Sequence, residues 1–385
     1  MAEELFIGLM SGTSIDGIDA ALVAFDSASQ LRVVETLFTP FEADIREAIS
    51  HTAQNNQDLF SNHDSPLDQT LAPIYASACE RLLAKADIPS AHIKGIANHG
   101  QTVKHEPNAS PPYSLQLGDG QTLADLTGIT TYSQFRQADI AAGGQGAPLM
   151  PAFHKAVFND TQSADSRLDK SAHNSRSNSF IVNIGGIANI TRLSEPIVGF
   201  DTGPGNVLLD QWIEQQLGLS YDKNGEWAKQ GKLSSELLKQ LLADRYFAEP
   251  HPKSTGTDYF NLAWLSGRYP SLTSLSPQDI QATLVQLTVE SIGDAILTLG
   301  DARGEIFVCG GGANNPLIMQ GLQAKLSAYL IEKTDVLGVP SDWVEAVGFA
   351  WLGYCRAHRI NSNIASVTGA ESELVLGEVF MPIKT

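Results

Sequence analysis

Apolar runs joined by glycine-rich turns recur at three places along the chain. Residues 5–10 predict a buried strand and residues 18–25 its antiparallel partner, with a Ser/Gly/Thr/Asp turn between them. Residues 180–191 repeat this plan of strand, glycine turn and strand. Residues 306–309 form another apolar run, which leads into a triple-glycine turn before a helix. Strands that alternate with helical segments predict an α/β protein.

Helical periodicity fills much of the chain between these strands. Residues 277–299 predict a long amphipathic packing helix, with apolar positions at Ile280, Leu284, Leu287, Ile292 and Ile296. Further helices are predicted at residues 42–52, 66–86, 120–127, 207–217 and 343–359. Further strands are predicted at residues 31–39, 93–97, 129–132 and 197–200.

The length of the chain predicts two domains. At 385 residues it exceeds what a single hydrophobic core usually organises. The flexible glycine segment 141–148 is the predicted crossing between the domains. We therefore expect an N-terminal lobe at residues 1–140, rejoined by residues from about 372 to 385, and a C-terminal lobe at residues 141–371. Residues 159–179 are polar and aperiodic, and they predict an exposed loop.

The turn between the first two strands has the composition of a phosphate-binding loop. Its glycines let backbone N–H groups converge on a ligand, which suits phosphate oxygens. Asp16 and Asp19 fit better as partners of a magnesium hydration shell or as proton acceptors. A polar hairpin turn that caps a core strand is the alternative that the residues leave open. The nucleotide candidates here are Gly12, Thr13, Ser14, Ile15, Asp16, Gly17, Ile18 and Asp19.

Later glycine turns supply the remaining nucleotide candidates. The triple-glycine turn, together with Asn314, allows close backbone approach to a purine or its ribose. These later candidates are Gly185, Gly186, Gly203, Gly205, Gly310, Gly311, Gly312 and Asn314.

Asp201 is the candidate base. It follows the predicted strand 197–200 and precedes a glycine turn and a helix. Because ligands gather at the carboxyl ends of strands in α/β sheets, this aspartate is well placed to act as a base in a cleft. Aspartate is also a favoured helix N-cap, so the residues alone leave both roles open.

Four further polar residues are functional candidates, and each also has an ordinary structural interpretation. His99 and Gln101 follow the predicted strand 93–97, which favours hydrogen bonds to a substrate, although a lone histidine there is more often structural. Lys253 lies in a Pro-flanked loop, where it either meets a phosphate as a point charge or remains solvated. Glu345 lies on a predicted helix and, taken alone, is typical of a solvated surface.

Charge and composition narrow the range of partners. The net charge is −18 and the pI is about 4.8, so nucleic acid backbones and anionic lipid surfaces are repelled and neither is an expected partner. A phosphate site must then be built from backbone amides or a metal ion. The three cysteines show no metal-type or redox-type pairing. The N-terminus is unlike a signal peptide, and no apolar stretch approaches the roughly twenty residues of a membrane helix, so we expect a cytoplasmic protein.

Five stretches resemble signatures of the anhydro-N-acetylmuramic acid kinase family, within the superfamily of sugar kinases, actin and heat-shock ATPases. They are residues 8–19, 98–102, 141–148, 199–206 and 253–256, and the resemblance runs nearly end to end. It implies a two-lobed actin-like ATPase (ribonuclease H-like) fold. In this fold each lobe is a mixed sheet flanked by helices, and the nucleotide lies in the interlobe cleft. The segment after Arg136 departs from the family pattern, which is usually richer in arginine.

The resemblance implies roles for individual residues. Asp201 is the implied base that activates water, Glu345 is implied to face the sugar, and Asp16 is implied to contact magnesium indirectly. The implied substrate-binding residues are Ser11, Thr13, His99, Gln101, Arg136 and Glu345.

The implied reaction uses ATP, Mg²⁺ and 1,6-anhydro-N-acetylmuramic acid, a product of cell-wall turnover. Water activated by Asp201 attacks the anomeric carbon, the anhydro bridge opens, and O6 takes the γ-phosphate. The products are N-acetylmuramic acid 6-phosphate and ADP. The family also implies a homodimer.

A second function class shares this fold. An actin-like or chaperone-like ATPase uses ATP as a conformational switch and carries the same glycine hairpins. It does not need residues 99–102 or 141–148, which have the character of substrate contacts. Other routes to catalysis are absent from the sequence, which has no P-loop, no protein-kinase signature set, no Gly-x-Ser-x-Gly elbow and no zinc-type spacing.

Overall fold

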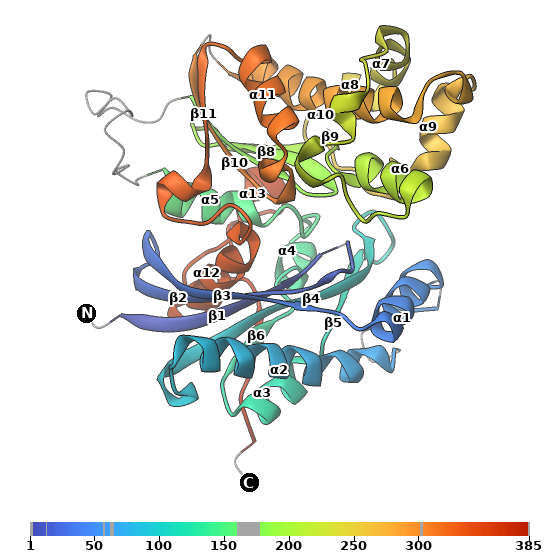
Figure 1. The fold of residues 1–385 in the computed structure, drawn as a ribbon. Coiled ribbons are helices and arrows are strands. Elements are labelled where there is room, and N and C mark those ends of the chain that lie inside the picture. Colours follow the sequence, from blue (N-terminus) through green and yellow to red (C-terminus); the bar gives the residue numbers. More distant parts are fainter. Residues whose placement is uncertain are drawn as a thin grey trace. The chain divides into compact units, whose positions relative to one another are not determined.

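The chain folds into two units, each with its own hydrophobic core. In the computed structural model, unit 1 comprises Met1–Thr161 and Trp343–Thr385, and unit 2 comprises Gln162–Asp342 (Figure 1). The structure describes residues 3–12, 14–56, 58–61, 65–159, 178–300 and 303–383. Most of the predicted polar loop 159–179 therefore lies outside the described residues, as does Thr13.

Unit 1 is built on a mixed sheet. Its seven described strands lie in the order β12-β6-β4-β1-β2-β3, with β5 paired to β4. The first three strands form an antiparallel meander, and β4 and β6 run parallel to β1. The strands are β1 (Glu4–Ser11), β2 (Gly17–Ser27), β3 (Gln30–Pro40), β4 (Ile93–Glu106), β5 (Tyr113–Leu117), β6 (Thr131–Ser133) and β12 (Glu378–Phe380).

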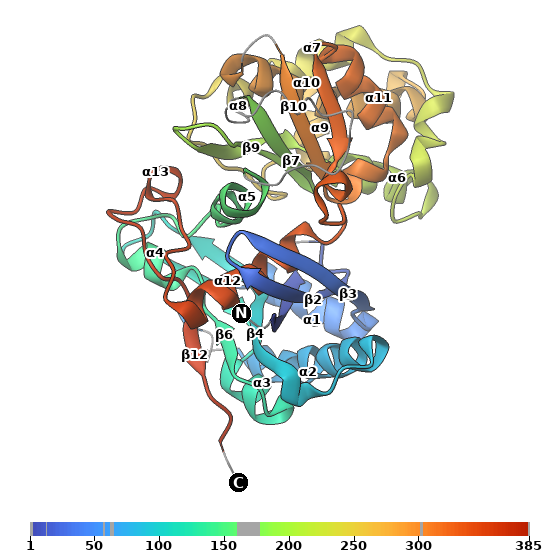
Figure 2. The ribbon, with the colours of Figure 1, turned by 90° about the vertical axis from the view of Figure 1, so that its left-hand side faces the viewer.

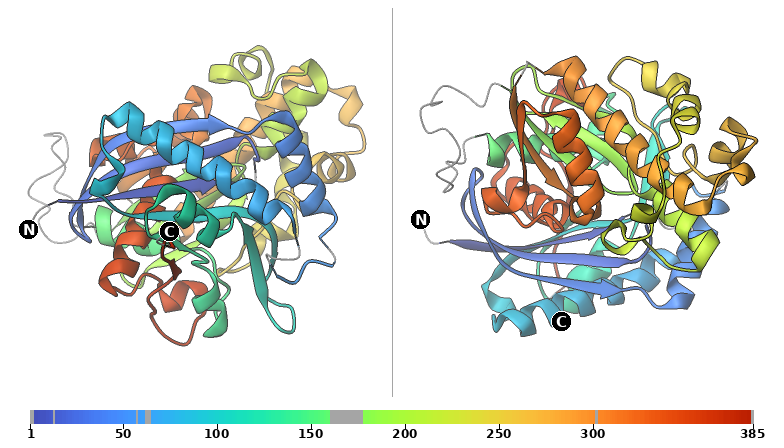
Figure 3. Two further views of the ribbon diagram at one scale, coloured as in Figure 1. Left: turned by 90° about the horizontal axis from the view of Figure 1, so that it is seen from below. Right: turned by 45° about the horizontal axis from the view of Figure 1, so that its top comes forward.

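Helices cover both faces of this sheet. One face carries α2, which packs on β2 and β3, and the other carries α12, which packs on β1, β2 and β4 (Figure 1 and Figure 3, left). The helices of unit 1 are α1 (Ala43–Gln54), α2 (Leu67–Ala86), α3 (Gly120–Thr127), α4 (Gln137–Ala141), α5 (Met150–Phe158), α12 (Val344–His358) and α13 (Ala365–Thr368).

The chain re-enters unit 1 earlier than the sequence predicts. The prediction places the boundary at residue 140 and the return near residue 372, whereas unit 1 runs through α5 and resumes at Trp343. Packing explains the difference, because α12 contacts both α5 and the sheet. The returning segment also pairs β12 with β6, and Figure 2 shows α12, α13 and β12, in red, beside α4 and β6.

Unit 2 repeats the strand order of unit 1. Its five described strands lie in the order β11-β10-β7-β8-β9. An antiparallel meander of β7, β8 and β9 is followed by β10 and β11, which run parallel to β7. A mixed sheet with the same order in each unit confirms the predicted α/β fold. The strands are β7 (Ser179–Ile184), β8 (Ile187–Arg192), β9 (Val198–Pro204), β10 (Gly304–Cys309) and β11 (Tyr329–Lys333).

The longest helix of unit 2, α10 (Pro277–Leu299), packs on β8 and β9 and is seen across the sheet in Figure 3, right. Among the described residues it is the one helix long and apolar enough to cross a membrane, which the sequence reading did not expect. The five apolar residues predicted to pack are each exposed by 1% or less, so its apolarity serves the core. The other helices are α6 (Val207–Leu217), α7 (Ser235–Leu242), α8 (Arg245–Ala248), α9 (Leu262–Arg268) and α11 (Pro316–Lys325).

Candidate functional site

The sequence predicts that His99 and Gln101 follow a strand, whereas in the structure both lie within β4. The strand continues to Glu106 because its second half pairs with β5. Gly100 has a φ of 76°, and one additional residue of β4 opposes β1 between Leu9 and Ser11. A bulge of this kind redirects side chains and is common next to binding sites.

His99 forms a buried pair with Arg136. Nη2 of Arg136 lies 3.0 Å from Nε2 of His99, and the imidazole also packs on the Phe349 ring at a centroid distance of 4.7 Å. Burial, and secondarily the charge of Arg136, lower the pKa of His99 to about 3. The imidazole is therefore neutral at physiological pH.

Arg136 is held by two hydrogen bonds, one of which is that to His99. Its Nη1 donates to the carbonyl oxygen of Gly146 at 2.8 Å. Burial lowers the pKa of Arg136 to about 10, while Glu345 and Asp139 oppose this effect. Burial likewise raises the pKa of Glu345, against the influence of Arg136. Glu345 therefore lies in a partly buried electrostatic pair, and the alternative of a solvated surface group is wrong.

Asp139 fixes the glycine loop 141–148 within unit 1. One carboxylate oxygen accepts from Gly146 N at 2.8 Å, and the other accepts from Asn363 Nδ2 at 2.7 Å and Thr368 Oγ1 at 2.6 Å. This loop is therefore tied to the returning segment of the chain. The carbonyl that holds Arg136 belongs to the same loop, so Asp139 also steadies Arg136.

Three buried polar atoms in this group have no hydrogen-bond partner in the described structure. They are His99 Nδ1, Gln101 Oε1 and Arg136 Nε. Buried polar atoms are normally paired, so an unpaired cluster that includes a donor, an acceptor and a cation points to a polar ligand. The described structure thus brings together three predicted substrate residues, His99, Arg136 and Glu345, and Gln101 lies two residues along β4 from His99.

Ser11, at the end of β1, uses its hydroxyl within unit 1. Its Oγ lies 2.5 Å from the hydroxyl of Tyr75 and donates to the carbonyl oxygen of Gly100 at 3.1 Å. The predicted role of Ser11 in substrate binding stays a prediction. Thr13, the other substrate candidate on this turn, lies outside the described residues.

The turn that follows β1 has a strained backbone. The carbonyl oxygen of Gly12 accepts from Gln101 Nε2 at 3.1 Å and from Ile15 N at 3.3 Å. Ile15 has a φ of 55°, which is an outlier for a β-branched residue and is typical of functional turns. Asp16 is exposed and accepts from Ser14 Oγ at 2.6 Å.

The remaining candidates of this first turn belong to β2. Gly17 begins the strand, Asp19 is half-buried, and the Ile18 side chain is fully buried in the core of unit 1. The Ile18 side chain therefore serves packing, and only its backbone remains a candidate for nucleotide binding.

Two glycine turns of unit 2 pack backbone against backbone. The carbonyl oxygen of Gly186 accepts from Gly205 N at 2.9 Å and Val207 N at 3.1 Å, and that of Gly185 accepts from Asn206 N at 2.8 Å. A Cβ at Gly205 would collide with the Gly185 carbonyl oxygen, so this approach requires glycine.

The triple-glycine turn follows β10 and lies at the same end of the unit 2 sheet as the turn at Gly185 and Gly186, which follows the parallel strand β7. A Cβ at Gly310 would collide with Asn183 Oδ1, and one at Gly312 with the Ile184 side chain. At Gly311, by contrast, the nearest atom to such a Cβ is Asn206 Nδ2 at 3.7 Å. The structure thus brings the predicted nucleotide turns of unit 2 together, with Gly311 at their least crowded point.

Asn314 follows this turn and is exposed. Its side chain donates to Asp342 Oδ1 at 2.7 Å and accepts from Lys333 Nζ at 2.6 Å. These partners occupy both ends of the amide, so its predicted role in nucleotide binding stays a prediction.

Asp201 lies inside β9, which continues to Pro204. Its backbone N donates to Lys253 O at 3.2 Å, and its Oδ2 accepts from Thr255 N at 3.0 Å. Burial raises the pKa of Asp201 to about 6, although the bond from Thr255 opposes this rise. Asn206 occupies the N-cap position of the helix that follows, which begins at Val207, so the alternative of an N-cap role for Asp201 is wrong.

A bulge adjoins this carboxylate. Ala188 pairs with Gly203 and Asn189 with Asp201, which leaves Thr202 as an additional residue of β9. The Thr202 hydroxyl donates to the carbonyl oxygen of Ala188 at 3.2 Å. This arrangement re-aims the side chain of Asp201 relative to a regular strand.

Lys253 is engaged within unit 2. Its Nζ donates to Tyr246 O at 2.8 Å and Phe247 O at 3.4 Å, and it lies 4.6 Å from the centroid of the Tyr246 ring. Burial lowers the pKa of Lys253. The ammonium is therefore neither merely solvated nor free to meet a phosphate without giving up these bonds.

The sequence reading missed several residues around these turns. Thr255 and Tyr246, which bond Asp201, were not candidates, because donation to a backbone atom or from a backbone N–H has no sequence signature. Asp210 was missed as well, although its spacing of four residues from Glu214 was a readable sign of like charges on one helix face. Burial, Asp222 and Glu214 raise the pKa of Asp210 to about 7.

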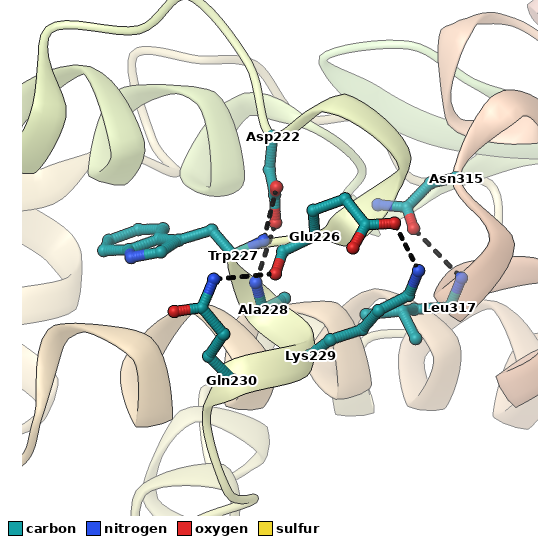
Figure 4. Close-up of polar contacts among 8 residues, drawn as sticks. All are labelled: Asp222, Glu226, Trp227, Ala228, Lys229, Gln230, Asn315 and Leu317. Carbon is teal, nitrogen blue, oxygen red and sulfur yellow. Dashed lines mark hydrogen bonds and ion pairs between the residues drawn. The ribbon is translucent and has the colours of Figure 1, made fainter.

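Asp222 also organises the loop that lies against the start of α11 (Figure 4). Its carboxylate oxygens accept from Trp227 N and Ala228 N, both at 2.9 Å. Gly225 of this loop lies so close to Asn315 and Leu317 that a Cβ there would approach both. Figure 4 shows the Asn315 side chain capping α11 through Leu317 N, at 3.1 Å.

Residues 4–382 match the family model of anhydro-N-acetylmuramic acid kinase. Three relatives named anhydro-N-acetylmuramic acid kinase align over almost the whole chain. The relative from Pasteurella multocida is 44% identical over 97% of this chain and 96% of its own length. That from Haemophilus influenzae is 44% identical over 99% and 98%, and that from Idiomarina loihiensis is 45% identical over 97% and 97%.

Proposed function

Since the chain belongs to the anhydro-N-acetylmuramic acid kinase family, we propose that it is an ATP-dependent kinase of 1,6-anhydro-N-acetylmuramic acid. It opens the anhydro bridge with water and phosphorylates O6. The products are N-acetylmuramic acid 6-phosphate and ADP, and the reaction serves the recycling of peptidoglycan. Of the two function classes that fit the fold, the family favours the metabolic kinase over the switch ATPase.

The observation that carries the proposal is the buried carboxylate of Asp201. With a pKa of about 6, it is mostly ionised at neutral pH and still basic enough to hold a proton. Asp201 takes a proton from water as the water oxygen bonds to C1 of the sugar and the C1–O6 bond breaks. The electron pair of that bond stays on O6, which attacks the γ-phosphorus, and ADP leaves.

Unit 1 supplies the proposed sugar contacts. Arg136 Nε is a cationic donor without a partner, which suits the carboxylate of an acidic sugar. Gln101 Oε1 is an unpaired acceptor, and His99 Nδ1 is an unpaired donor, as sugar hydroxyl and acetamido groups require. Glu345 balances the charge of Arg136. Ser11 and Thr13 complete the proposed substrate set.

We assign the phosphates and nucleoside of ATP to the glycine turns. In unit 2 these are the three turns around Gly185, Gly205 and Gly311, and the turn after β1 of unit 1 stays a phosphate candidate from the sequence. Each brings backbone atoms close together in a chain whose net charge would otherwise repel phosphate.

Among the described residues, magnesium fits through its water shell. The described residues contain no group of three His, Cys, Asp or Glu side chains that would chelate a metal. Mg²⁺ commonly keeps several waters and binds through substrate phosphates with one or two carboxylates. The exposed carboxylate of Asp16 is the proposed partner of such a water. When bound, magnesium spreads the charge of the transferring phosphoryl group.

Cytoplasmic location and a homodimer are part of the proposal. The location is the expectation from the sequence pattern, whereas the dimer comes from the family and is tested by light scattering of the purified protein. Fractionation of cells that express the chain tests its location.

The kinase itself is tested by an ADP-release assay with ATP, magnesium and 1,6-anhydro-N-acetylmuramic acid. N-Acetylmuramic acid and N-acetylglucosamine are the control sugars, and mass spectrometry identifies the product. ADP and a 6-phosphate formed only with the anhydro sugar support the proposal. ADP formed with an ordinary sugar would show a kinase with a different sugar substrate. Slow ADP release that does not depend on any sugar would favour the switch ATPase.

A further inference from the structure

Asp244 is a buried carboxylate at the centre of a hydrogen-bond cluster in unit 2. It is only 1% exposed. Burial would raise the pKa of Asp244, but the surrounding donors outweigh burial and hold the pKa below its usual range. The donors are Tyr246 N at 2.8 Å, Tyr259 OH at 2.9 Å, Trp264 Nε1 at 2.8 Å and the guanidinium of Arg268. The Asp244 side chain thus holds together, through hydrogen bonds, the segment from α8 to the end of α9.

Tyr246 connects Asp244 to Asp201. Its backbone N–H is held by Asp244, and its hydroxyl donates to the backbone carbonyl oxygen of Asp201 at 2.7 Å. The side chain is 4% exposed and packs edge-to-face on the Phe260 ring at a centroid distance of 5.4 Å. Lys253 Nζ lies 4.6 Å from the centroid of this ring and donates to the Tyr246 carbonyl oxygen. Tyr246 is therefore fixed at its backbone, its ring and its hydroxyl.

Three bonds to Asp201 come from this same segment. Tyr246 OH bonds its carbonyl oxygen, Lys253 O accepts from its N–H, and Thr255 N donates to its carboxylate. The only one of the three that touches the carboxylate is the bond from Thr255. That bond depends on where the segment lies, and the segment is anchored on β9 by Tyr246.

We propose that Asp244 and Tyr246 are positioning residues for the base, because they hold residues 244–255 against β9 and so keep the Asp201 carboxylate in place. Neither residue touches substrate. Asp244 fixes Tyr246, Tyr246 fixes the Asp201 backbone, and Thr255 N then meets Oδ2. The inference deepens the proposed function, since it rests on Asp201 as the base.

The groups around Asp201 allow a displacement of the segment to be measured through the pKa of the Asp201 carboxylate. Of the titratable side chains of the segment, Tyr246 bonds Asp201, while Lys253 and Glu249 act on Tyr246. Burial and Asp201 raise the pKa of Tyr246. Across the sheet, β8 presents the uncharged Asn189. From α10, the uncharged Thr288 bonds Pro204 O at 3.1 Å, and Ser291 lies against Gly203. Among the described groups, a change in the titration of Asp201 therefore reports a change in the position of residues 244–255.

The first test is Tyr246→Phe, which removes the hydroxyl and keeps the ring. A carboxylate loses stabilisation of its charged form when an N–H bond weakens, so we expect the titration of Asp201 to move up by about half a pH unit. We expect kcat to fall about tenfold with an unchanged KM for ATP, as for a misplaced base. Tyr269→Phe is the matched control, since it makes the same chemical change in unit 2, and it should alter neither value.

The titration is followed by carbon-13 NMR of protein labelled at aspartate carboxyls, with Asp201→Asn to assign the resonance. This readout does not depend on the substrate. A shifted titration supports the positioning role, even if the wild-type protein releases no ADP with the anhydro sugar, an outcome that would refute the proposed function alone. An unchanged titration in Tyr246→Phe overturns the proposal, whatever happens to turnover.

Asp244→Asn is the second variant. It keeps the size of the side chain and replaces an acceptor for four donors with an amide. We expect a titration shift in the same direction as for Tyr246→Phe, and at least as large. A soluble Asp244→Asn protein with a wild-type Asp201 titration would also overturn the proposal.

Discussion

Nη2 of Arg136 lies 3.0 Å from Nε2 of His99. A guanidinium only donates hydrogen bonds, so Nε2 is the acceptor and the imidazole proton is on Nδ1. Nδ1 has no partner within the described structure. Arg136 therefore sets the tautomer of His99 and leaves an N–H donor for a ligand.

Arg136→Lys should weaken sugar binding. Lysine is a point charge and does not reproduce the fork that bonds both Gly146 O and His99 Nε2. We expect the KM for the anhydro sugar to rise about tenfold and the KM for ATP to stay unchanged. Steady-state kinetics with each substrate varied in turn provide the measurement. Arg32→Lys, in an exposed ion pair with Glu3, is the control, and equal effects of the two variants would contradict the assignment.

Asp201→Asn should abolish turnover and spare ATP binding. The amide keeps the shape of the side chain but takes no proton from water, so kcat should fall by about 10²–10⁴. Calorimetric titration with ATP should give the wild-type affinity. Asp258→Asn, an exposed carboxylate of unit 2, serves as the control. Substantial activity in Asp201→Asn would show that another group is the base.

The acid limb of the pH profile should report Asp201. The base works only when ionised, and burial raises the pKa of Asp201 to about 6. We therefore expect kcat/KM to be flat above this value and to fall about tenfold per pH unit below it. A profile whose acid limb lies near pH 4 would contradict a base whose pKa is raised by burial.

Asp210 should make unfolding pH-dependent. Its pKa of about 7 in the folded chain exceeds the value of about 4 for an unfolded aspartate. The folded state therefore binds more protons between these values, and the free energy of unfolding falls as pH rises from about 4 to about 7. Asp210→Asn removes this loss, so it should stabilise the protein by about 1–2 kcal/mol at pH 8 and less at pH 5. Urea unfolding at both pH values measures it.

Glu236→Gln on α7 is the control for that measurement, because Glu236 is exposed and should show no comparable gain. Equal stabilities of Asp210→Asn and the wild type at pH 8 would mean that Asp210 is ionised without cost in the folded chain.

Gly205→Ala should destabilise unit 2. The added Cβ meets the Gly185 carbonyl oxygen, so the two glycine turns must separate, at a cost of about 1–3 kcal/mol. Gly267→Ala on α9 has open space around the added methyl group and should be neutral or slightly stabilising. Urea denaturation compares the two variants, and a stable Gly205→Ala would mean that the turns are not tightly packed.

Periodic segments were predictable from the sequence. The hairpins β1–β2 and β7–β8 and the helix α10 follow from local apolar patterns that the tertiary structure keeps. Asp201, His99 and Gln101 became candidates because they follow apolar runs, although β9 and β4 continue past them, and their roles stay predictions.

Features that depend on tertiary pairing were not predictable. The extension of β4 past Gly100 requires β5, and the boundary of unit 1 requires α12 to pack on the sheet. The connection from Asp244 through Tyr246 to Asp201 uses backbone atoms, which all residues share. Composition and spacing carry no trace of such bonds.

The return of the chain into unit 1 has a consequence for biosynthesis. On a ribosome, all of unit 2 emerges before Val344–His358, the helix that covers one face of the first sheet. Unit 2, a single run of chain with its own core, is able to finish folding first. Until α12 arrives, the β1–β2–β4 face remains apolar and uncovered, so a nascent chain stalled before Val344 is a natural client for chaperones.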